Sequence, residues 1–194
     1  MLTSLFYFCI ANTVQSMLIE YQNSRAFQFV NDNYQPLYDI FHLHLPYIPS
    51  CWCLSDIAGV LPLIIMLWSN PGCIWQFLFA QATLISFRTL LFNVTVLPTA
   101  RAKERNVELK GLIKRPWYFL PAMHEYNDLI FSGHVATATL CLHWLVKFSL
   151  EWYVTLFLIF VTSLSVILTR EHYSVDVFLG GYIGITLPLL LKSL

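Results

Sequence analysis

Long apolar runs separated by short polar segments dominate the hydrophobic pattern of this 194-residue chain. A helix needs about 20 apolar residues to cross a bilayer core, and six segments come close to that length. They cover residues of roughly 2–19, 51–68, 73–97, 129–147, 151–169 and 173–191. The second run is interrupted by Ser55, Asp56 and Pro62. The pattern predicts an all-α integral membrane protein with six transmembrane helices in one bundle.

Two long loops separate these runs. The first, over residues 20–50, is aromatic and polar, and we expect it to lie at the membrane interface. The second, over residues 98–128, holds six basic residues. An even number of spans puts both termini on one side of the membrane, and the positive-inside rule would then place the basic loop in the cytosol. No internal repeat is visible, so we expect one membrane domain over residues 1–194.

The composition agrees with a multi-pass membrane location. Hydrophobic residues make up 57% of the chain and charged residues 11%, whereas a soluble domain carries about a quarter charged residues. The mean hydropathy is +0.62. A net charge of zero argues against a nucleic-acid partner. The first apolar run has no preceding positive charge, which disfavours a cleaved signal peptide.

Ionisable side chains inside membrane spans are costly and therefore often mark functional sites. Arg88, His134, His172 and Asp176 occupy such positions. In a six-span topology, the end of the third span and the starts of the fourth and sixth spans face the same side. We therefore expect these four residues to converge near one membrane surface. A transporter or channel would instead need ionisable groups spread through the depth of the bundle.

The stretch "TREHYSVD" contains a histidine and a carboxylate four residues apart, His172 and Asp176. This spacing predicts that both lie on one face of a helix. The carboxylate could accept a hydrogen bond from one imidazole nitrogen and leave the other for nucleophilic or general-base work. A polar pair that only caps the start of a helix would have the same spacing.

The stretch "DLIFSGHVATA" and the earlier "FRTLLFNVTVLP" supply groups suited to phosphate. Ser132 and Gly133 are expected to open a helix, where backbone N–H groups and the helix dipole favour an anion. His134 follows at once and could protonate a leaving group. Arg88 offers a planar cation for phosphate oxygens, the alternative being an arginine that snorkels to the membrane surface.

The remaining polar residues are weaker candidates. His42 and His44 alternate in "FHLHLP", but no third metal ligand lies near them, so we interpret them as interfacial residues. We expect His143 to make an interhelical contact. Asp56 could line the path by which lipid reaches the site, and His124 could join its rim.

These motifs, together with "PLYD" and "CLSDIAG", resemble the sphingomyelin synthase family and the related phosphatidylcholine:diacylglycerol cholinephosphotransferase, within the type 2 phosphatidic acid phosphatase superfamily. The resemblance implies transfer of a phospho-headgroup, without metal or cofactor, from a membrane phospholipid donor to ceramide or diacylglycerol. It implies that His172 is the nucleophile, Asp176 its orienting carboxylate and His134 the acid for the leaving alcohol. Arg88 and Asp128 match polar positions of the flanking motifs.

The chain departs from the hydrolytic branch of that superfamily at two cation positions. That branch carries a lysine seven residues before an arginine–proline pair, where this chain has Glu108. It also carries a serine–arginine pair whose arginine lies six residues before the histidine of the last motif. Here Ser165 is present, but Val166 occupies the arginine position. We therefore expect a transferase. A lipid phosphate phosphatase is the alternative enzyme, and a catalytically idle lipid-binding protein or scaffold is the alternative outside enzymes.

Overall fold

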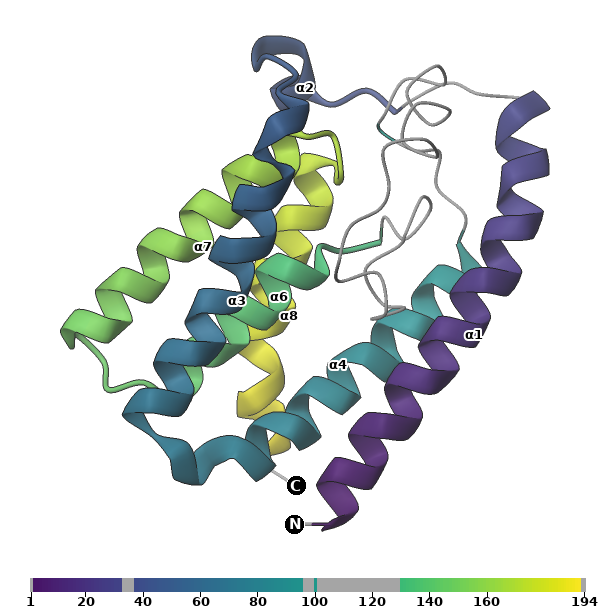
Figure 1. The fold of residues 1–194 in the computed structure, drawn as a ribbon. Helices are drawn as coiled ribbons and strands as arrows, with labels where there is room; N and C mark the ends of the chain where they lie inside the picture. The colour runs from purple at the N-terminus through teal and green to yellow at the C-terminus, as the bar shows by residue number, and fades with distance from the viewer. Residues whose placement is uncertain (1, 33–36, 96–99, 101–129, 193–194) are drawn as a thin grey trace.

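The structure is a computed structural model, and it describes residues 2–32, 37–95, 100 and 130–192 (Figure 1). Every regular element in this part of the chain is helical, as the apolar pattern predicts. The α-helices are α1 (Leu2–Asp32), α2 (Ile40–His44), α3 (Trp52–Ser69), α4 (Ile74–Val94), α6 (Gly133–Cys141), α7 (Leu150–Leu168) and α8 (Ser174–Leu191). The basic side chains of the loop predicted over residues 98–128, together with Glu108, His124 and Asp128, lie outside the described residues.

Four helical segments are long and apolar enough to cross a membrane. They are Pro49–Ser69, Pro71–Leu91, Leu150–Leu168 and Ser174–Lys192, and they correspond to the second, third, fifth and sixth predicted spans. Helix α1 contributes a shorter apolar stretch, Leu2–Leu18. The chain is therefore a multi-pass integral membrane protein, but a count of six spans is not confirmed.

The helix expected over residues 129–147 is shorter than predicted. It consists of the nine-residue α6 followed by a 3-10 turn at Leu142–Trp144. Nine residues rise about 14 Å, less than half of a hydrocarbon core of about 30 Å. Most of α6 is buried inside the protein. The apolar residues of α6 thus contact neighbouring helices. A helix buried in this way does not need the length of a membrane span.

Helix α6 lies close to α8 because two glycines of α8 face it. A Cβ atom at Gly180 would lie 2.7 Å from the Ser132 carbonyl oxygen, and one at Gly184 would lie 2.5 Å from that of Ala136. Small residues four apart allow this close approach of backbones in membrane helices. The glycines therefore fix the start of α6 against the first turns of α8.

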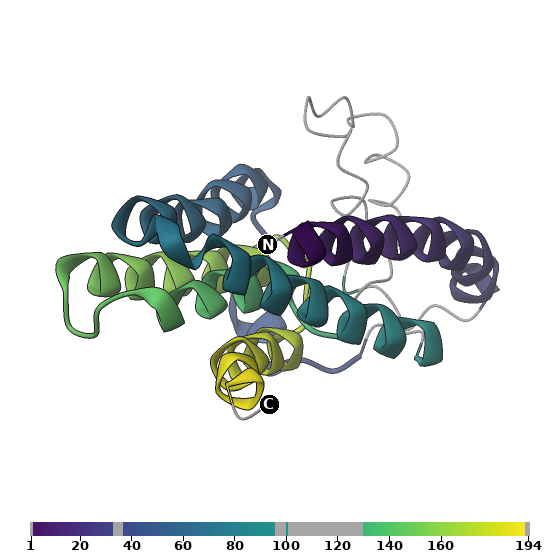
Figure 2. The same cartoon turned by 90° about the horizontal axis from the view of Figure 1, so that it is seen from below.

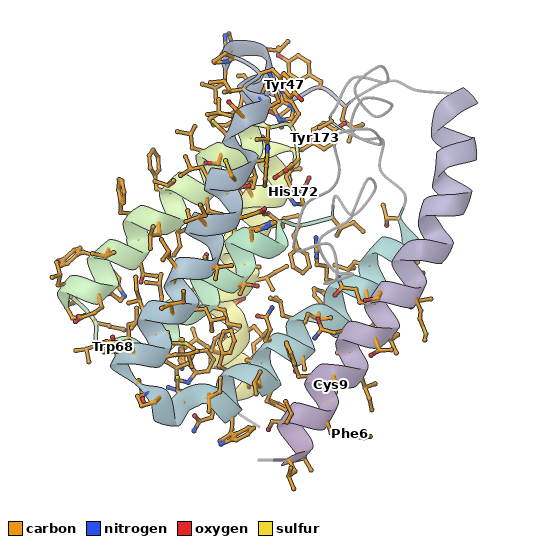
Figure 3. All side chains as sticks on the ribbon, in the orientation of Figure 1. Phe6, Cys9, Tyr47, Trp68, His172 and Tyr173 are labelled. Atoms are coloured by element: carbon orange, nitrogen blue, oxygen red, sulfur yellow. The ribbon has the colours of Figure 1, made fainter. Side chains whose placement is uncertain are left out.

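Two helix pairs flank this centre. Helix α3 lies beside α7, and α1 lies beside α4, as both views agree (Figures 1 and 2). Helix α1 begins and α8 ends at the same end of the bundle, as the sequence predicts for the termini (Figure 1). The opposite end carries α2 and the loop between α7 and α8, and His172 and Tyr173 are labelled there in Figure 3. The polar residues of interest gather towards that end.

Candidate active site

His172 and Asp176 form a buried pair where α8 begins. The distance between His172 Nδ1 and Asp176 Oδ2 is 3.7 Å, and their side chains are 8% and 1% exposed. This distance suits an ion pair but exceeds an ordinary hydrogen bond. Catalytic hydrogen bonds are often this long without substrate and tighten when it binds. The carboxylate therefore lies on the Nδ1 side of the imidazole.

The pair forms in a different way from the one that its spacing predicted. His172 lies in the loop before α8, because Tyr173 is the N-cap residue and Ser174 the first residue of the helix. Asp176 Oδ2 accepts a hydrogen bond from the Tyr173 N–H at 2.9 Å, as in a capping box. The expectation that both residues share one face of a helix is thus wrong. The cap and the pair with His172 use the same carboxylate.

The start of α6 lies against the start of α8. Ser132 is the N-cap of α6, and its Oγ accepts a hydrogen bond from the Val135 N–H at 3.4 Å, so the predicted helix start is confirmed. The Ser132 N–H donates to the Asp176 carbonyl at 2.9 Å. The N-terminal end of a helix attracts anions through its N–H groups and dipole. Here that end is tied directly to the residue that faces His172.

Arg88 reaches the same place from α4. A Cβ atom at Gly133 would lie 2.9 Å from Arg88 Nη1, so the guanidinium lies directly beside Gly133, the first residue of α6, and would have to shift for a larger residue there. The guanidinium carbon also lies 6.0 Å from the centre of the Phe131 ring. Arg88 therefore lies over the start of α6. A bound phosphate there would meet a planar cation suited to its oxygens.

His134 faces α3. Its Nε2 lies 3.3 Å from Asp56 Oδ1, with the two side chains 31% and 20% exposed. One turn further along α3, Gly59 lies against the imidazole. A Cβ atom at Gly59 would lie 3.1 Å from His134 Cδ2. Asp56 therefore contacts a predicted site residue directly, which goes beyond the expectation that it lines a lipid path.

The segment around α2 closes the same end of the bundle. Asp39 is the N-cap of α2, and its Oδ2 also accepts a hydrogen bond from the Ser174 N–H at 2.6 Å. His42 Nε2 lies 3.1 Å from the His172 carbonyl oxygen. Arg170, at a positive φ of 57°, donates to the carbonyls of His42 and Leu45. The backbone on both sides of His172 is thus held by this segment.

Two groups of this segment have shifted pKa values. Burial of the His42 ring and, after it, the positive charge of Arg170 lower the pKa of His42. Burial would raise the pKa of Asp39, but hydrogen bonds from Ser174 and from the His42 N–H together lower it below its usual value. We therefore infer that near neutral pH His42 is uncharged and Asp39 is ionised. An ionised Asp39 can accept its backbone N–H groups, and an uncharged His42 does not repel the nearby Arg170.

The structure brings together the predicted groups Arg88, Ser132, Gly133, His172 and Asp176, whereas Asp128 lies outside the described residues. Their catalytic roles stay predictions. No group of three or more His, Cys, Asp or Glu side chains that could hold a metal occurs among the residues described.

The sequence interpretation missed two contacts, those of Asp39 and Asp56. An Asp before a short apolar helix is a recognisable N-cap signal, so the first half of the role of Asp39 was visible in "PLYDIF". Nothing in the local sequence indicates its second contact, at Ser174. The contact of Asp56 with His134 likewise joins segments far apart in the chain.

Comparison with known proteins finds similar sequences for the part of the chain that carries these contacts. The family model described as PAP2 superfamily C-terminal matches residues 126–193, which include His134, His172 and Asp176. This part of the chain is similar to the PAP2 superfamily. Sphingomyelin synthase-related protein 1 from Mus musculus is 25% identical over 180 residues, and its Homo sapiens counterpart is 24% identical over 177 residues. These matches confirm the resemblance noted in the motifs.

Each of these two matches covers 77% of this chain. The same alignments cover 36% of the mouse protein and 42% of the human protein. The chain thus spans less than half the length of the curated relatives that it matches.

Proposed function

We propose that this protein transfers a phospho-headgroup, phosphocholine or a similar group, from a glycerophospholipid to ceramide or diacylglycerol. In this proposal the whole chain acts as one membrane domain, and residues 88–176 carry the chemistry. The observation that carries the proposal is the 3.7 Å approach of His172 Nδ1 to Asp176 Oδ2 at the helix start that also meets Ser132. It supports a histidine nucleophile held beside an anion-binding helix end.

In the first step, His172 Nε2 attacks the phosphorus of the donor lipid. The bond between phosphorus and the glycerol oxygen breaks, and His134 gives its proton to that oxygen, so that diacylglycerol leaves. The headgroup phosphate is now bound to Nε2 of His172. Asp176 lies on the Nδ1 side, where a carboxylate stabilises the positive charge that the imidazole gains.

In the second step, a lipid alcohol takes the place of the departed diacylglycerol. His134 accepts the proton of its hydroxyl, the oxygen attacks phosphorus, and the bond to His172 breaks. Phosphoryl transfer depends mostly on positioning and on stabilising charge at the phosphate oxygens. Arg88 and the N-terminal end of α6 are suited to that task.

Hydrolysis, with water as the acceptor, is the second candidate function. One observation favours transfer over it. Val166, at the position where the hydrolytic branch carries an arginine, is fully buried in an apolar cluster with Val135, Ile167 and Val177. The side chain at this position is therefore packed among apolar groups and offers no charge to a phosphate.

The test is a headgroup-transfer assay with the purified protein in mixed micelles. Donor lipids labelled in a choline, ethanolamine or inositol headgroup are offered with ceramide or with labelled-acyl diacylglycerol as acceptor, beside His172→Ala and Asn70→Ala variants. Asn70 is exposed at the far end of α3, so its variant controls for detergent and handling effects. Label that moves to one acceptor in the wild type and in Asn70→Ala, but not in His172→Ala, supports the proposal. Release of free phospho-headgroup, with neither acceptor used, would support the phosphatase instead.

A further inference from the structure

We infer that Asp56 is a positioning residue for His134 and that it selects Nδ1 as the nitrogen that exchanges a proton with the lipid oxygen. The inference rests on the proposed function, because it concerns the acid and base step of that reaction. Two contacts of the His134 ring carry it. They involve different atoms of α3, one polar and one apolar.

The polar contact fixes Nε2. His134 Nε2 lies 3.3 Å from Asp56 Oδ1, so an N–H on Nε2 faces a carboxylate oxygen. A hydrogen bond at one imidazole nitrogen determines the tautomer and so decides which nitrogen is left to react. With Nε2 carrying a hydrogen towards Asp56, Nδ1 becomes the nitrogen that takes up or releases the transferred proton.

The apolar contact fixes the edge of the ring. A Cβ atom at Gly59 would lie 3.1 Å from Cδ2 and 3.5 Å from Cβ of His134, so the Cδ2 edge lies against the backbone of α3. Nδ1 is on the opposite edge of an imidazole and therefore points away from α3. Asp56 and Gly59 are three residues apart on one helix face. Together they hold the His134 ring in one orientation against α3.

Neither Asp56 nor Gly59 of α3 has a role in the proposed mechanism as described above. Asp56 lies in the second turn of α3, towards its N-terminal end. A carboxylate inside a membrane span is costly unless it is paired or functional. The contact with His134 pairs the Asp56 carboxylate, and the proposed role of His134 gives that carboxylate a function.

The reaction supplies a readout that a purely structural role would not move. A diacylglycerol oxygen leaves poorly without a proton, whereas 4-nitrophenolate leaves without one. We therefore compare phosphatidylcholine with 4-nitrophenyl phosphocholine in single-turnover release of the leaving group. General acid catalysis contributes about 10²–10⁴-fold, so His134→Ala should lose that factor with phosphatidylcholine and little with the nitrophenyl ester.

Asp56→Ala should show the same selective loss, of about 10-fold or more, as a fraction of the general acid contribution. Asp56→Asn should lose less, because its amide oxygen still accepts from Nε2, and Asp56→Glu should recover part of the activity. The double variant Asp56→Ala/His134→Ala should be no slower than His134→Ala alone, since both act through one ring. Asn70→Ala, at the C-cap of α3, again serves as the control.

The outcomes separate the two proposals. Wild-type protein that forms neither transferred product nor free headgroup would overturn the proposed function itself. A working wild type, with His172→Ala inactive and Asp56→Ala equal to Asn70→Ala on phosphatidylcholine, would overturn the role of Asp56 alone. An equal loss on both substrates in Asp56→Ala, or a double variant slower than His134→Ala by the full single-variant factor, would also overturn it.

Discussion

Asp39 caps two helices with one carboxylate, and its replacement by alanine is expected to loosen both. Oδ1 accepts the N–H groups of Phe41 and His42 at 2.9 and 3.1 Å, and Oδ2 accepts that of Ser174 at 2.6 Å. The residue is 7% exposed. Loss of an N-cap costs about 1 kcal/mol, and a hydrogen bond to a charged group contributes about 1.5–3 kcal/mol. Asp39→Ala should therefore lower the free energy of unfolding by about 2–4 kcal/mol.

The variant Asp39→Asn tests whether one side chain caps both helices. Its single side-chain oxygen can serve α2 or Ser174, but its amide group would face a backbone N–H at the other position. Asp39→Asn should therefore fall between wild type and Asp39→Ala. Glu151→Gln is the matched control, because Glu151 is an exposed carboxylate in the first turn of α7. Its change should leave the stability close to that of the wild type.

Thermal unfolding in one detergent, followed by the loss of helical signal, gives the stability ranking. Hydrogen exchange of the Ser174 amide reports the cap of α8 separately. Because His172 lies two residues before Ser174, Asp39→Ala should also slow headgroup transfer about 10-fold or more, through misplacement of the nucleophile. Equal unfolding temperatures for Asp39→Ala and Glu151→Gln, with unchanged exchange at Ser174, would refute the double cap.

Three further changes test the contacts around the site. Gly133→Ala places a Cβ atom 2.9 Å from Arg88 Nη1 and should slow transfer about 10-fold or more by moving the guanidinium. The control is Gly181→Ala, whose added Cβ atom meets only an ordinary contact at 3.9 Å. The two variants should unfold at the same temperature, and equal transfer activities would contradict the prediction. Arg170→Ala removes the donors to two carbonyls at the end of α2 and should destabilise the fold by about 1.5–3 kcal/mol in chemical unfolding. Arg170→Gly should be less destabilised, because glycine adopts the positive φ of 57° without strain, and the reverse order would contradict the assignment. The pKa of His42 is lowered below the usual 6.5 by burial and by Arg170, so the unfolded chain takes up a proton first as the pH falls through that value, and stability should decline there. His42→Gln should remove this part of the pH dependence in unfolding curves, and an unchanged dependence would contradict it.

Four of the six predicted spans match helices of the structure within three residues at each end. The run predicted over 51–68 became Trp52–Ser69, and the run over 151–169 became Leu150–Leu168. Hydropathy succeeds here because each run has about the length of a bilayer core and ends at polar or turn-forming residues. Pro62, which weakened the second prediction, is accommodated inside α3.

The same criterion fails for α6, because hydropathy does not distinguish a helix buried in protein from one exposed to lipid. The signal that could have helped is the pair Gly180 and Gly184, whose missing side chains imply a close neighbour on one face of α8. The neighbour itself could not be identified from sequence. Pairing of one helix with another depends on how each is rotated about its axis.

The convergence of Arg88, the start of α6 and the start of α8 followed from counting spans, and the structure agrees with it. The contacts of Asp39 and Asp56 did not follow, since they depend on the return of the first loop and on the rotation of α3. His172 shows the same limit on a smaller scale. Its spacing from Asp176 was correct as a sign of a pair, but the helix starts after it.

The charges of the site end also form a consistent set. Asp39, Asp56 and Asp176 each face a backbone N–H or a histidine, so each carboxylate is directed at a group that the fold or the proposed reaction positions. The starts of α6 and α8 meet there and bring two positive helix ends together, beside the guanidinium of Arg88. A phosphoryl group in the proposed reaction would therefore meet positive partners first, while the negative charges act on the residues that hold and protonate it. In the proposed reaction, this division of roles would let a site with three carboxylates bind the phosphate of its lipid substrate.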